Sequence, residues 1–477
     1  RGASTVIFSY LRRYEFWILL VAGLVWLNVG ADGGWLRFVL AAVPGGLMLA
    51  AAIGTLNMPG SRGVNRLGGF GGLIGVLMSV PVLFVAPATA LGLGLLAAAG
   101  LVASGLLSLE EFPLPEGLPR VERDVRTGAE VGFDEAVLGL ASVLMAPYAG
   151  STQPRVARET RAALELFEDR GWLKDPHAFH RRPPPLGAGD VRLRGANSLG
   201  WAYEELSFES GYEPWPETPG RDRYLSYGAC RRAVAWLLRG NPSAPWMICI
   251  HGLGMGRGHM DLTLLYGALL HRELGLNLVF PVLPLHGPRR KGAVSGRGFQ
   301  DGDFLDTVHA ESQAIWDIRR LRSWIGLHGD TPLGVHGMSM GGFHTALLAS
   351  LDDGLACAIA GIPVADQSAL VWHHTAPASL SALAAEGVTR DTASELFQVV
   401  SPLRLPPLLA RERRFIYAGV ADRFVPADQV LQLVEHWEGP EACWYPGAHL
   451  SFPRHQMVGD FIAGAVRKTL LGDGAEG

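Results

Sequence analysis

The chain has 477 residues, enough for two or three domains, and 48% of them are hydrophobic, a high share for a wholly soluble protein. Its formal net charge is −4, and residues 1–108 carry six arginines and only two acidic residues, so the rest of the chain is acidic. This balance argues against a nucleic-acid partner, which requires a basic face. The four cysteines include no C-x-x-C pair and fit a reduced compartment.

Three stretches near the N-terminus contain no charged residue: 16–31, 38–61 and 67–109. A single bilayer span takes ~20 residues, so the third and longest stretch fits two spans with a break near Pro87. Residues 1–109 are therefore predicted to form a transmembrane region of about four helices.

The arginines around these stretches predict an orientation. Three precede the first span and two lie between the second and third spans, whereas the opposite side has only Arg37; the five are Arg1, Arg12, Arg13, Arg62 and Arg66. The positive-inside rule then puts the N-terminus in the cytoplasm, and four spans return the chain there. The 38 arginines against three lysines hint at a bacterial source, so we expect a bacterial inner-membrane protein with a cytoplasmic catalytic domain.

Residues 110–195 are predicted to form a helical and proline-rich linker segment. Residues 110–126 are charged and contain proline, and helical spacing of apolar residues follows at 133–145 and 159–173. Residues 181–185 read Arg-Arg-Pro-Pro-Pro, which is typical of a rigid, extended linker.

Residues 196–477 contain a series of short apolar segments and helical stretches. The first two strands, at 205–209 and 231–238, are expected to be antiparallel, and a long helix is expected at 303–327. The other expected strands are 246–250, 277–284, 331–336, 355–361, 413–419 and 442–445. Two further helices are expected at 379–386 and 391–400.

The motif Gly337-Met338-Ser339-Met340-Gly341 has the form G-x-S-x-G. It follows the expected strand 331–336 and precedes a plausible helix at 342–349, the context that a nucleophile elbow requires. Glycines let the backbone turn tightly around the serine. Ser339 is therefore the candidate nucleophile.

A serine hydroxyl needs a base, usually a histidine oriented by a carboxylate, and in α/β-hydrolases these follow the serine in the order acid, then histidine. Asp422 comes just after the expected strand 413–419, and His449 follows the strand 442–445. These two residues are the candidate acid and base. Three other aspartates compete for the role of the acid, namely Asp352, Asp353 and Asp366.

The expected strand 246–250 runs into His251-Gly252-Leu253-Gly254. Glycine at this place lets backbone N–H groups approach a developing oxyanion closely. We assign the two oxyanion donors to the N–H of Leu253 and to the N–H of Met340, the residue after the nucleophile.

Together these motifs resemble the α/β-hydrolase superfamily over residues of about 200 to 470. The resemblance implies a mostly parallel sheet flanked by helices and acyl transfer through an acyl-enzyme, with no cofactor. It also implies a catalytic domain at 196–477, in which residues 362–412 occupy the place where members often have a lid. The chain departs from many members in its long hydrophobic N-terminal extension.

Other histidines have more ordinary interpretations. His251 is expected to shape a turn, and His336 and His344 to pack inside. His286 lies in a loop with a basic run at 289–291, which either borders the pocket and meets an anionic head group or, as we favour, is solvated. The pairs His177/His180 and His373/His374 lack a completing cluster, so no metal site is expected, and the chain has no dinucleotide or Walker A motif.

The sequence thus predicts a membrane-anchored serine hydrolase of the esterase, lipase or thioesterase type, acting on a small-molecule or lipid acyl substrate. Acyl transfer to an alcohol or amine in place of water stays open, as do the acyl chain, the leaving group and the oligomeric state. A membrane scaffold or transport-associated protein with a regulatory or inactive hydrolase domain is the alternative. Against transport, the three uncharged stretches hold no ionisable residue that would mark an ion pathway.

Overall fold

The computed structural model describes residues 9–31, 34–112, 114–144, 153–299 and 303–472, so Arg1 and Met145, which entered the sequence analysis, lie outside the described residues. The chain divides into two compact units. Unit 1 comprises Arg1–Ala146, Ala418–Ala427 and Trp444–His455. Unit 2 comprises Pro147–Tyr417, Asp428–Cys443 and Gln456–Gly477. Unit 1 therefore combines the N-terminal region with two short segments from the C-terminal part of the chain.

Unit 1 contains four apolar helices, each long and apolar enough to cross a membrane. Their order and number confirm the predicted region of four apolar helices at the N-terminus, and Pro87 begins the last of them, where its fixed φ suits a first turn. A fifth, less apolar helix follows. The five helices are α2 (Tyr14–Ala31), α3 (Gly34–Asn57), α4 (Arg62–Val82), α5 (Pro87–Glu111) and α6 (Val125–Leu144).

Glycines bring the backbones of α4, α5 and α6 into direct contact. A Cβ atom at Gly105 of α5 would overlap the backbone of Gly128 and Gly132 in α6, and one at Gly132 would overlap the carbonyl of Leu101. A Cβ atom at Gly69 of α4 would in turn come too close to the carbonyl of Gly132. Small residues allow such close helix packing. Helix α6 is thereby fixed against two of the apolar helices.

A nine-stranded sheet, with the order β1-β2-β3-β5-β4-β6-β7-β8-β9, forms the centre of the hydrolase part of the chain. Strands β1, β2, β3 and β5 pair antiparallel in that order, whereas β5, β4, β6, β7 and β8 pair parallel. Every residue of β4 to β8 is buried, as expected for parallel strands covered on both faces. The strands are β1 (Arg192–Ser198), β2 (Trp201–Glu209), β3 (Arg232–Leu238), β4 (Trp246–Ile250), β5 (Asn277–Val282), β6 (Leu333–Met338), β7 (Cys357–Gly361), β8 (Arg414–Gly419) and β9 (Glu441–Tyr445).

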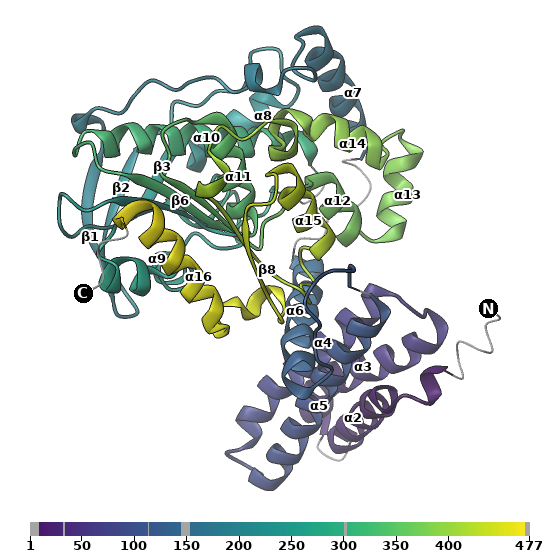
Figure 1. Ribbon diagram of the computed structural model, residues 1–477. Coiled ribbons are helices and arrows are strands. Elements are labelled where there is room, and N and C mark those ends of the chain that lie inside the picture. Colours follow the sequence, from purple (N-terminus) through teal and green to yellow (C-terminus); the bar gives the residue numbers. More distant parts are fainter. Residues whose placement is uncertain (1–8, 32–33, 113, 145–152, 300–302, 473–477) are drawn as a thin grey trace. The chain divides into compact units, whose positions relative to one another are not determined.

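Helices cover both faces of this sheet. Figure 1 shows α9 and α16 on one face and α10 and α11 on the other. With the serine motif at the turn between β6 and α11, this arrangement confirms the predicted α/β-hydrolase fold. The helices named here, with the one that follows β8, are α9 (Gly258–Leu264), α10 (Phe304–Gly326), α11 (Met340–Leu351), α15 (Ala427–His436) and α16 (Gln456–Val466).

Residues 362–412 contribute short helices that pack with α7 and α10 around a shared apolar cluster. Members of this cluster include Phe167, Trp172, Phe304, Leu396 and Val400. The helices expected at 379–386 and 391–400 are α13 and α14, and a further helix, α12, precedes them. The bounds of these elements, with the short helix before β3, are α7 (Gln153–Asp169), α8 (Arg221–Leu225), α12 (Gln367–His374), α13 (Pro377–Ala385) and α14 (Arg390–Phe397).

Two elements differ from the sequence-based expectation. The hairpin of β1 and β2 begins at Arg192, inside the segment expected to be a linker, and turns through Leu199 and Gly200, both with positive φ. Most of β1 is exposed, so the strand lacks the apolar alternation that would have revealed it. The last α-helix, for which the sequence predicts a start near Phe452, begins at Gln456, because residues His449–Arg454 form a 3-10 turn that contains Pro453.

We expect Gly105→Ala to destabilise the protein, because the added methyl group would force α5 and α6 apart. Overpacking of this kind typically costs about 1–3 kcal/mol. Thermal unfolding in detergent measures the change. The matched control is Gly92→Ala on the same helix, where a Cβ atom would meet no described heavy atom within 4 Å. Equal unfolding midpoints for the two variants would contradict the close packing of α5 and α6.

Candidate active site

Ser339 lies in the sharp turn between β6 and α11 in unit 2. Its φ of 58° and ψ of −117° lie in a region that non-glycine residues rarely adopt, and such strain costs of order 1–3 kcal/mol. The Ser339 N–H donates to the carbonyl of Gly361 (2.8 Å), and the N–H of Val364 donates to the carbonyl of Ser339 (3.2 Å). The end of β7 thus holds the strained serine in place.

Glycines on both sides of the serine are required by sterics. A Cβ atom at Gly337 would overlap the backbone of Gly341, and one at Gly341 would overlap the carbonyl of Ile250 at the end of β4. Helix α11 therefore starts against the neighbouring strand, with Met340 as its first residue. The motif has the backbone geometry of a nucleophile elbow.

The loop after β4 passes beside the serine. A Cβ atom at Gly252 would lie 3.4 Å from the Cβ of Ser339, so the segment that carries Leu253 lies next to the elbow. His251 stabilises this loop: its Nε2 accepts from the N–H of Leu283 (3.0 Å), and its Nδ1 donates to the carbonyl of Gly252 (2.8 Å). Burial lowers the pKa of His251. Both ring nitrogens are used, and the residue shapes the turn as the sequence suggested.

Unit 1 contains the candidate acid and base in direct contact. His449 Nδ1 donates to Asp422 Oδ2 across 2.6 Å, and both side chains are buried. The other oxygen of Asp422 accepts from the backbone N–H groups of Phe424 (2.8 Å) and Val425 (2.7 Å), which fixes the carboxylate within its own loop. The Phe424 ring stacks on the imidazole with a centroid distance of 4.8 Å. A histidine that donates through Nδ1 has Nε2 available to accept a proton.

The charges around His449 favour its protonated form. Burial alone would lower the pKa of His449, but the carboxylates of Asp422 and Asp134 outweigh it and raise the pKa above its ordinary value. An imidazole that gains stability on protonation is suited to take a proton from a nucleophile during a reaction.

The competing aspartates have other partners. Asp352 forms an ion pair with Arg319 (2.7 Å), and Asp366 caps α12 by accepting from the N–H of Ala369 (3.0 Å). The backbone carbonyl of Asp353 accepts from Arg322. Asp422 is thus the one of the four sequence candidates that contacts His449.

The loop at 285–291 is only partly solvated, because Leu285, His286, Gly287 and Arg289 are buried, whereas Arg290 is exposed and Lys291 is half-buried. His286 is fully buried, and Arg289 is buried in an ion pair with Asp317 (2.7 Å). Arg289 also donates to the backbone carbonyls of Val282 and Cys230. Strand β5, the 3-10 turn at Cys230 and helix α10 supply these partners, which explains why Arg289 can lie in the interior.

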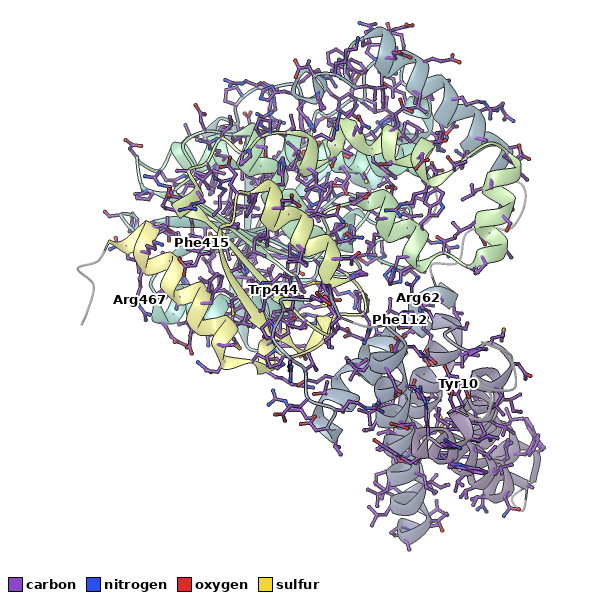
Figure 2. All side chains as sticks on the ribbon, turned by 45° about the vertical axis from the view of Figure 1, so that its right-hand side comes forward. Tyr10, Arg62, Phe112, Phe415, Trp444 and Arg467 are labelled. Carbon is purple, nitrogen blue, oxygen red and sulfur yellow. The ribbon has the colours of Figure 1, made fainter. Side chains whose placement is uncertain are left out.

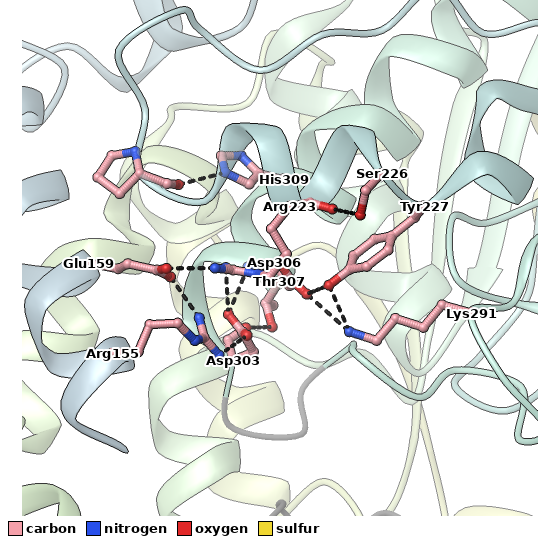
Figure 3. A network of polar contacts seen from close by, with 11 residues as sticks. Arg155, Glu159, Arg223, Ser226, Tyr227, Lys291, Asp303, Asp306, Thr307 and His309 are labelled. Atoms are coloured by element: carbon pink, nitrogen blue, oxygen red, sulfur yellow. Dashed lines mark hydrogen bonds and ion pairs between the residues drawn. The ribbon is translucent and has the colours of Figure 1, made fainter. Parts of the chain in front are cut away.

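Lys291 belongs to a network of charges around the start of α10 (Figure 3). Arg223 of α8 pairs with Glu159, Asp303 and Asp306, and Lys291 pairs with Asp306 (3.1 Å). Arg155 of α7 completes the network with Glu159 and Asp303. Three cations thus face three carboxylates and join α7, α8 and α10, so an anionic head group is not needed to neutralise Lys291.

The remaining histidines of the sequence analysis give no metal site in the described part of the chain, where no group of three potential ligands occurs. His336 and His344 are fully buried, as expected. His344 Nε2 lies 2.5 Å from Glu311, a carboxylate of α10.

One buried acidic residue near the candidate base was not singled out from the sequence. Asp134 of α6 accepts hydrogen bonds from the backbone N–H groups of His449 (2.8 Å), Leu450 (3.0 Å) and Arg423 (3.2 Å). Glu130 and Asp134 are four residues apart on the apolar face of α6, beside Val131 and Leu138. Acidic residues are rarely buried, so their place on the apolar face of this helix is the sequence signal that could have identified Asp134.

Two curated relatives match most of the chain. Uncharacterized protein MT2702 of Mycobacterium tuberculosis strain CDC 1551 / Oshkosh is 42% identical over 362 residues, which cover 75% of this chain and 86% of the relative. Uncharacterized protein Rv2627c of strain ATCC 25618 / H37Rv is 41% identical over the same length, with the same coverage. No protein-family model matches the chain.

Solved structures resemble the chain more distantly. An acetyl xylan esterase from Paenibacillus sp. R4 superimposes with a TM-score of 0.44 at 14% identity, covering 68% of this chain and 98% of the esterase. An acylaminoacyl peptidase from Pyrococcus horikoshii superimposes with a TM-score of 0.37 at 15% identity, covering 60% of this chain and 43% of the peptidase.

The Asp422–His449 pair predicts a pH-dependent contribution to stability. Because the pKa of His449 is raised in the folded state, the pair stabilises the fold fully below the unfolded-state pKa of about 6.5 and loses this effect as the pH rises through the folded-state pKa. We therefore expect Asp422→Asn to lower the unfolding midpoint most near pH 6 and progressively less toward pH 9. Thermal unfolding at several pH values measures this. If the unfolding midpoint of Asp422→Asn lay below that of the unaltered protein by an amount that stayed constant or grew with pH, the charge interaction would be contradicted.

Proposed function

This chain belongs to the same family as the mycobacterial proteins MT2702 and Rv2627c, and we propose that it is a membrane-anchored serine hydrolase that cleaves esters or thioesters through an acyl-enzyme. The observation that carries the proposal is the buried His449–Asp422 pair, joined across 2.6 Å. The chain also has Ser339 in a strained turn between a strand and a helix. Ser339, Asp422 and His449 are the residue types of a catalytic triad, and they follow one another in the order typical of α/β-hydrolases.

The proposed mechanism uses only groups of the chain itself. Ser339 Oγ attacks the acyl carbonyl carbon while His449 Nε2 accepts its proton, and Asp422 orients the imidazole and stabilises its positive charge. The N–H groups of Leu253 and Met340 donate to the oxyanion of the tetrahedral intermediate. The intermediate collapses as His449 protonates the departing alcohol or thiol.

The second half of the reaction regenerates the enzyme. His449 removes a proton from a water molecule, whose oxygen attacks the acyl-enzyme, and the acid product leaves as Ser339 recovers its proton from His449. An alcohol or amine that replaced this water would turn the same steps into acyl transfer. No step of this mechanism requires a metal or an organic cofactor.

The four apolar helices support anchoring in a bilayer, and the arginine distribution supports a cytoplasmic catalytic part in a bacterial inner membrane. An active site tethered to a membrane suits a lipid or another acylated substrate. The acidic balance of the rest of the chain is consistent with a substrate other than nucleic acid.

Ser339→Ala tests the assignment of the nucleophile. Removing the nucleophile of a serine hydrolase typically costs about 10⁶ in turnover, so we expect the variant to lose both labelling by a fluorophosphonate probe and hydrolysis of p-nitrophenyl esters. The assays use the full chain in detergent. The matched control is Ser350→Ala on the same helix, whose hydroxyl donates to the carbonyls of Ala346 and Leu405. Normal hydrolysis by the Ser339 variant would refute the proposal.

Membrane anchoring predicts how the full chain fractionates. Because each of the four apolar helices is long enough to span a bilayer, we expect the protein to remain in the membrane pellet after an alkaline carbonate wash and to be released by detergent. In inverted inner-membrane vesicles, added protease should digest the hydrolase part. Recovery in the carbonate supernatant would contradict anchoring, and protection from protease would contradict the cytoplasmic orientation.

A further inference from the structure

A single carboxylate in α6 binds the two loops that carry the candidate acid and base. Asp134 is fully buried; one oxygen accepts from the N–H groups of His449 (2.8 Å) and Arg423 (3.2 Å), and the other accepts from the N–H of Leu450 (3.0 Å). Arg423 is the neighbour of Asp422 in the loop after β8, and His449 lies in the loop after β9. All these residues belong to unit 1.

We propose that Asp134 is a positioning residue for catalysis: it holds the backbone of both loops so that Asp422 and His449 face each other, and it adds a negative charge beside the imidazole. The inference rests on the proposed function, since it assigns a role within that same site. It also gives the N-terminal helical region a part in catalysis beyond anchoring.

The hydrogen bonds of Asp134 are made to backbone N–H groups, so they fix the position of the His449 backbone from which the imidazole projects. With the N–H of His449 held by Asp134 and its Nδ1 held by Asp422, the two side-chain torsions of the histidine have little freedom. Preorganised groups of this kind cost no reorganisation during reaction. The bond to Arg423 N–H fixes the acid loop to the same carboxylate.

A second acidic residue of α6 supports the same loop one helical turn earlier. Glu130 Oε2 lies 3.2 Å from His455 Nε2, and a Cβ atom at Gly447 would come too close to Glu130, so this side chain packs against the segment that leads to His449. Although burial opposes it, hydrogen bonds from His455 and Arg126 lower the pKa of Glu130 to about 2. Residues four apart in a helix lie on one face, so Glu130 and Asp134 present one surface to the loop.

The charges that face this cluster come from several elements. Asp134 and Glu135 of α6 and Asp422 of the acid loop are opposed by the buried guanidinium of Arg423, and His449 completes the set. Burial and the neighbouring Asp422 raise the pKa of Asp134, while the backbone N–H groups and His449 favour its ionised form.

The Arg423 guanidinium lies 5.8 Å from the centre of the Phe112 ring. Arg62, at the start of α4, lies over the same ring at 4.9 Å (Figure 2). Phe112 is the C-terminal cap of α5, so the ring at the end of one apolar helix contacts both Arg423, the cation that faces Asp134, and Arg62 at the start of another.

Helix α6 is itself fixed against the apolar helices α4 and α5 by the glycine contacts at Gly69, Gly105 and Gly132. The position of Asp134, and with it that of the His449 backbone, therefore depends on helices that are long enough to span a membrane. This gives a continuous physical connection from the anchor to the catalytic histidine within unit 1.

The experiment compares Asp134→Asn with the unaltered full chain in detergent, measuring the rate of fluorophosphonate labelling from pH 5 to pH 9. Asparagine has the same shape but only one acceptor oxygen, so its NH₂ group must face at least one of the three N–H donors. A displacement of the catalytic group by about 1 Å can cost 10²-fold in rate, and we expect a loss of about that size.

The pH profile separates positioning from a general loss of stability. His449 must be neutral to act as a base, so labelling rises as the pH passes its pKa. Without the charge of Asp134 the imidazolium loses stabilisation, its pKa falls, and the midpoint of the labelling curve moves to lower pH. A merely structural role would lower the fraction of folded protein and leave this midpoint in place.

Two further variants complete the test. Asp124→Asn removes an exposed carboxylate that accepts from the N–H of Thr127 at the start of α6, away from the cluster, and its labelling curve should match the wild type. Asp134→Glu keeps the charge but displaces the acceptors, so we expect the wild-type midpoint with a reduced rate; this variant carries the test if Asp134→Asn does not fold. Wild-type rate and midpoint in folded Asp134→Asn, or a wild-type rate in Asp134→Glu, would overturn the inference.

The same data distinguish this inference from the proposed function. If wild type is labelled at Ser339 and the Asp134 variants behave as wild type, the inference fails and the hydrolase assignment stands. If wild type is not labelled, or Ser339→Ala is labelled equally, the proposed function fails, and the role of Asp134 in catalysis fails with it.

Discussion

Three backbone N–H groups from two loops converge on the carboxylate of Asp134, and the geometry of the candidate acid and base depends on this convergence. A buried carboxylate is costly unless several donors satisfy it, and a loop backbone is mobile unless something fixes it. Here the loop N–H groups satisfy the buried carboxylate of Asp134, and the carboxylate in turn fixes the backbone of the two loops. The helix that supplies the carboxylate is fixed by glycine contacts to helices long enough to span a membrane, so these helices and the acid–base pair belong to one compact unit.

The serine is held by a different principle. Its strained backbone is stabilised by the surrounding parallel sheet, through hydrogen bonds to Gly361 and Val364 and through the absence of side chains at Gly337 and Gly341. Strain persists only where the surrounding structure over-determines it, and a turn enclosed by three buried strands satisfies that condition. The elbow and the acid–base pair are thus positioned by separate sets of contacts, one in the sheet and one in the helical unit.

The parts of the fold that the sequence predicted are those with local signatures. The three uncharged stretches, the G-x-S-x-G motif and the apolar strands β4 to β8 could be predicted from a few neighbouring residues, because composition and periodicity report burial directly. The exposed strand β1 could not, since its pairing with β2 compensates for residues without apolar alternation. Arg289 looked solvated because its partner Asp317 is 28 residues away in the chain.

Asp134 illustrates the same limit within the site. Its partners are more than 280 residues distant in sequence, and they are backbone groups, which carry no residue-specific pattern. Every residue except proline has a backbone N–H, so a long-range hydrogen bond from this group requires no particular residue type at the donor position. The candidate nucleophile, acid and base were identifiable because chemistry dictates their types and order, whereas the residue that positions the acid and base has only one local signal, an acidic side chain on the apolar face of α6.

The most direct test of the account is a structure of the full chain after reaction with a fluorophosphonate, determined in a lipid nanodisc. The account predicts a phosphonyl group on Ser339 Oγ, with its oxygen near the N–H groups of Leu253 and Met340 and with His449 Nε2 directed at the adduct. It also predicts that the Asp134 carboxylate still accepts from His449 N–H. An adduct on another residue, or a His449 ring turned away from Ser339, would contradict the account.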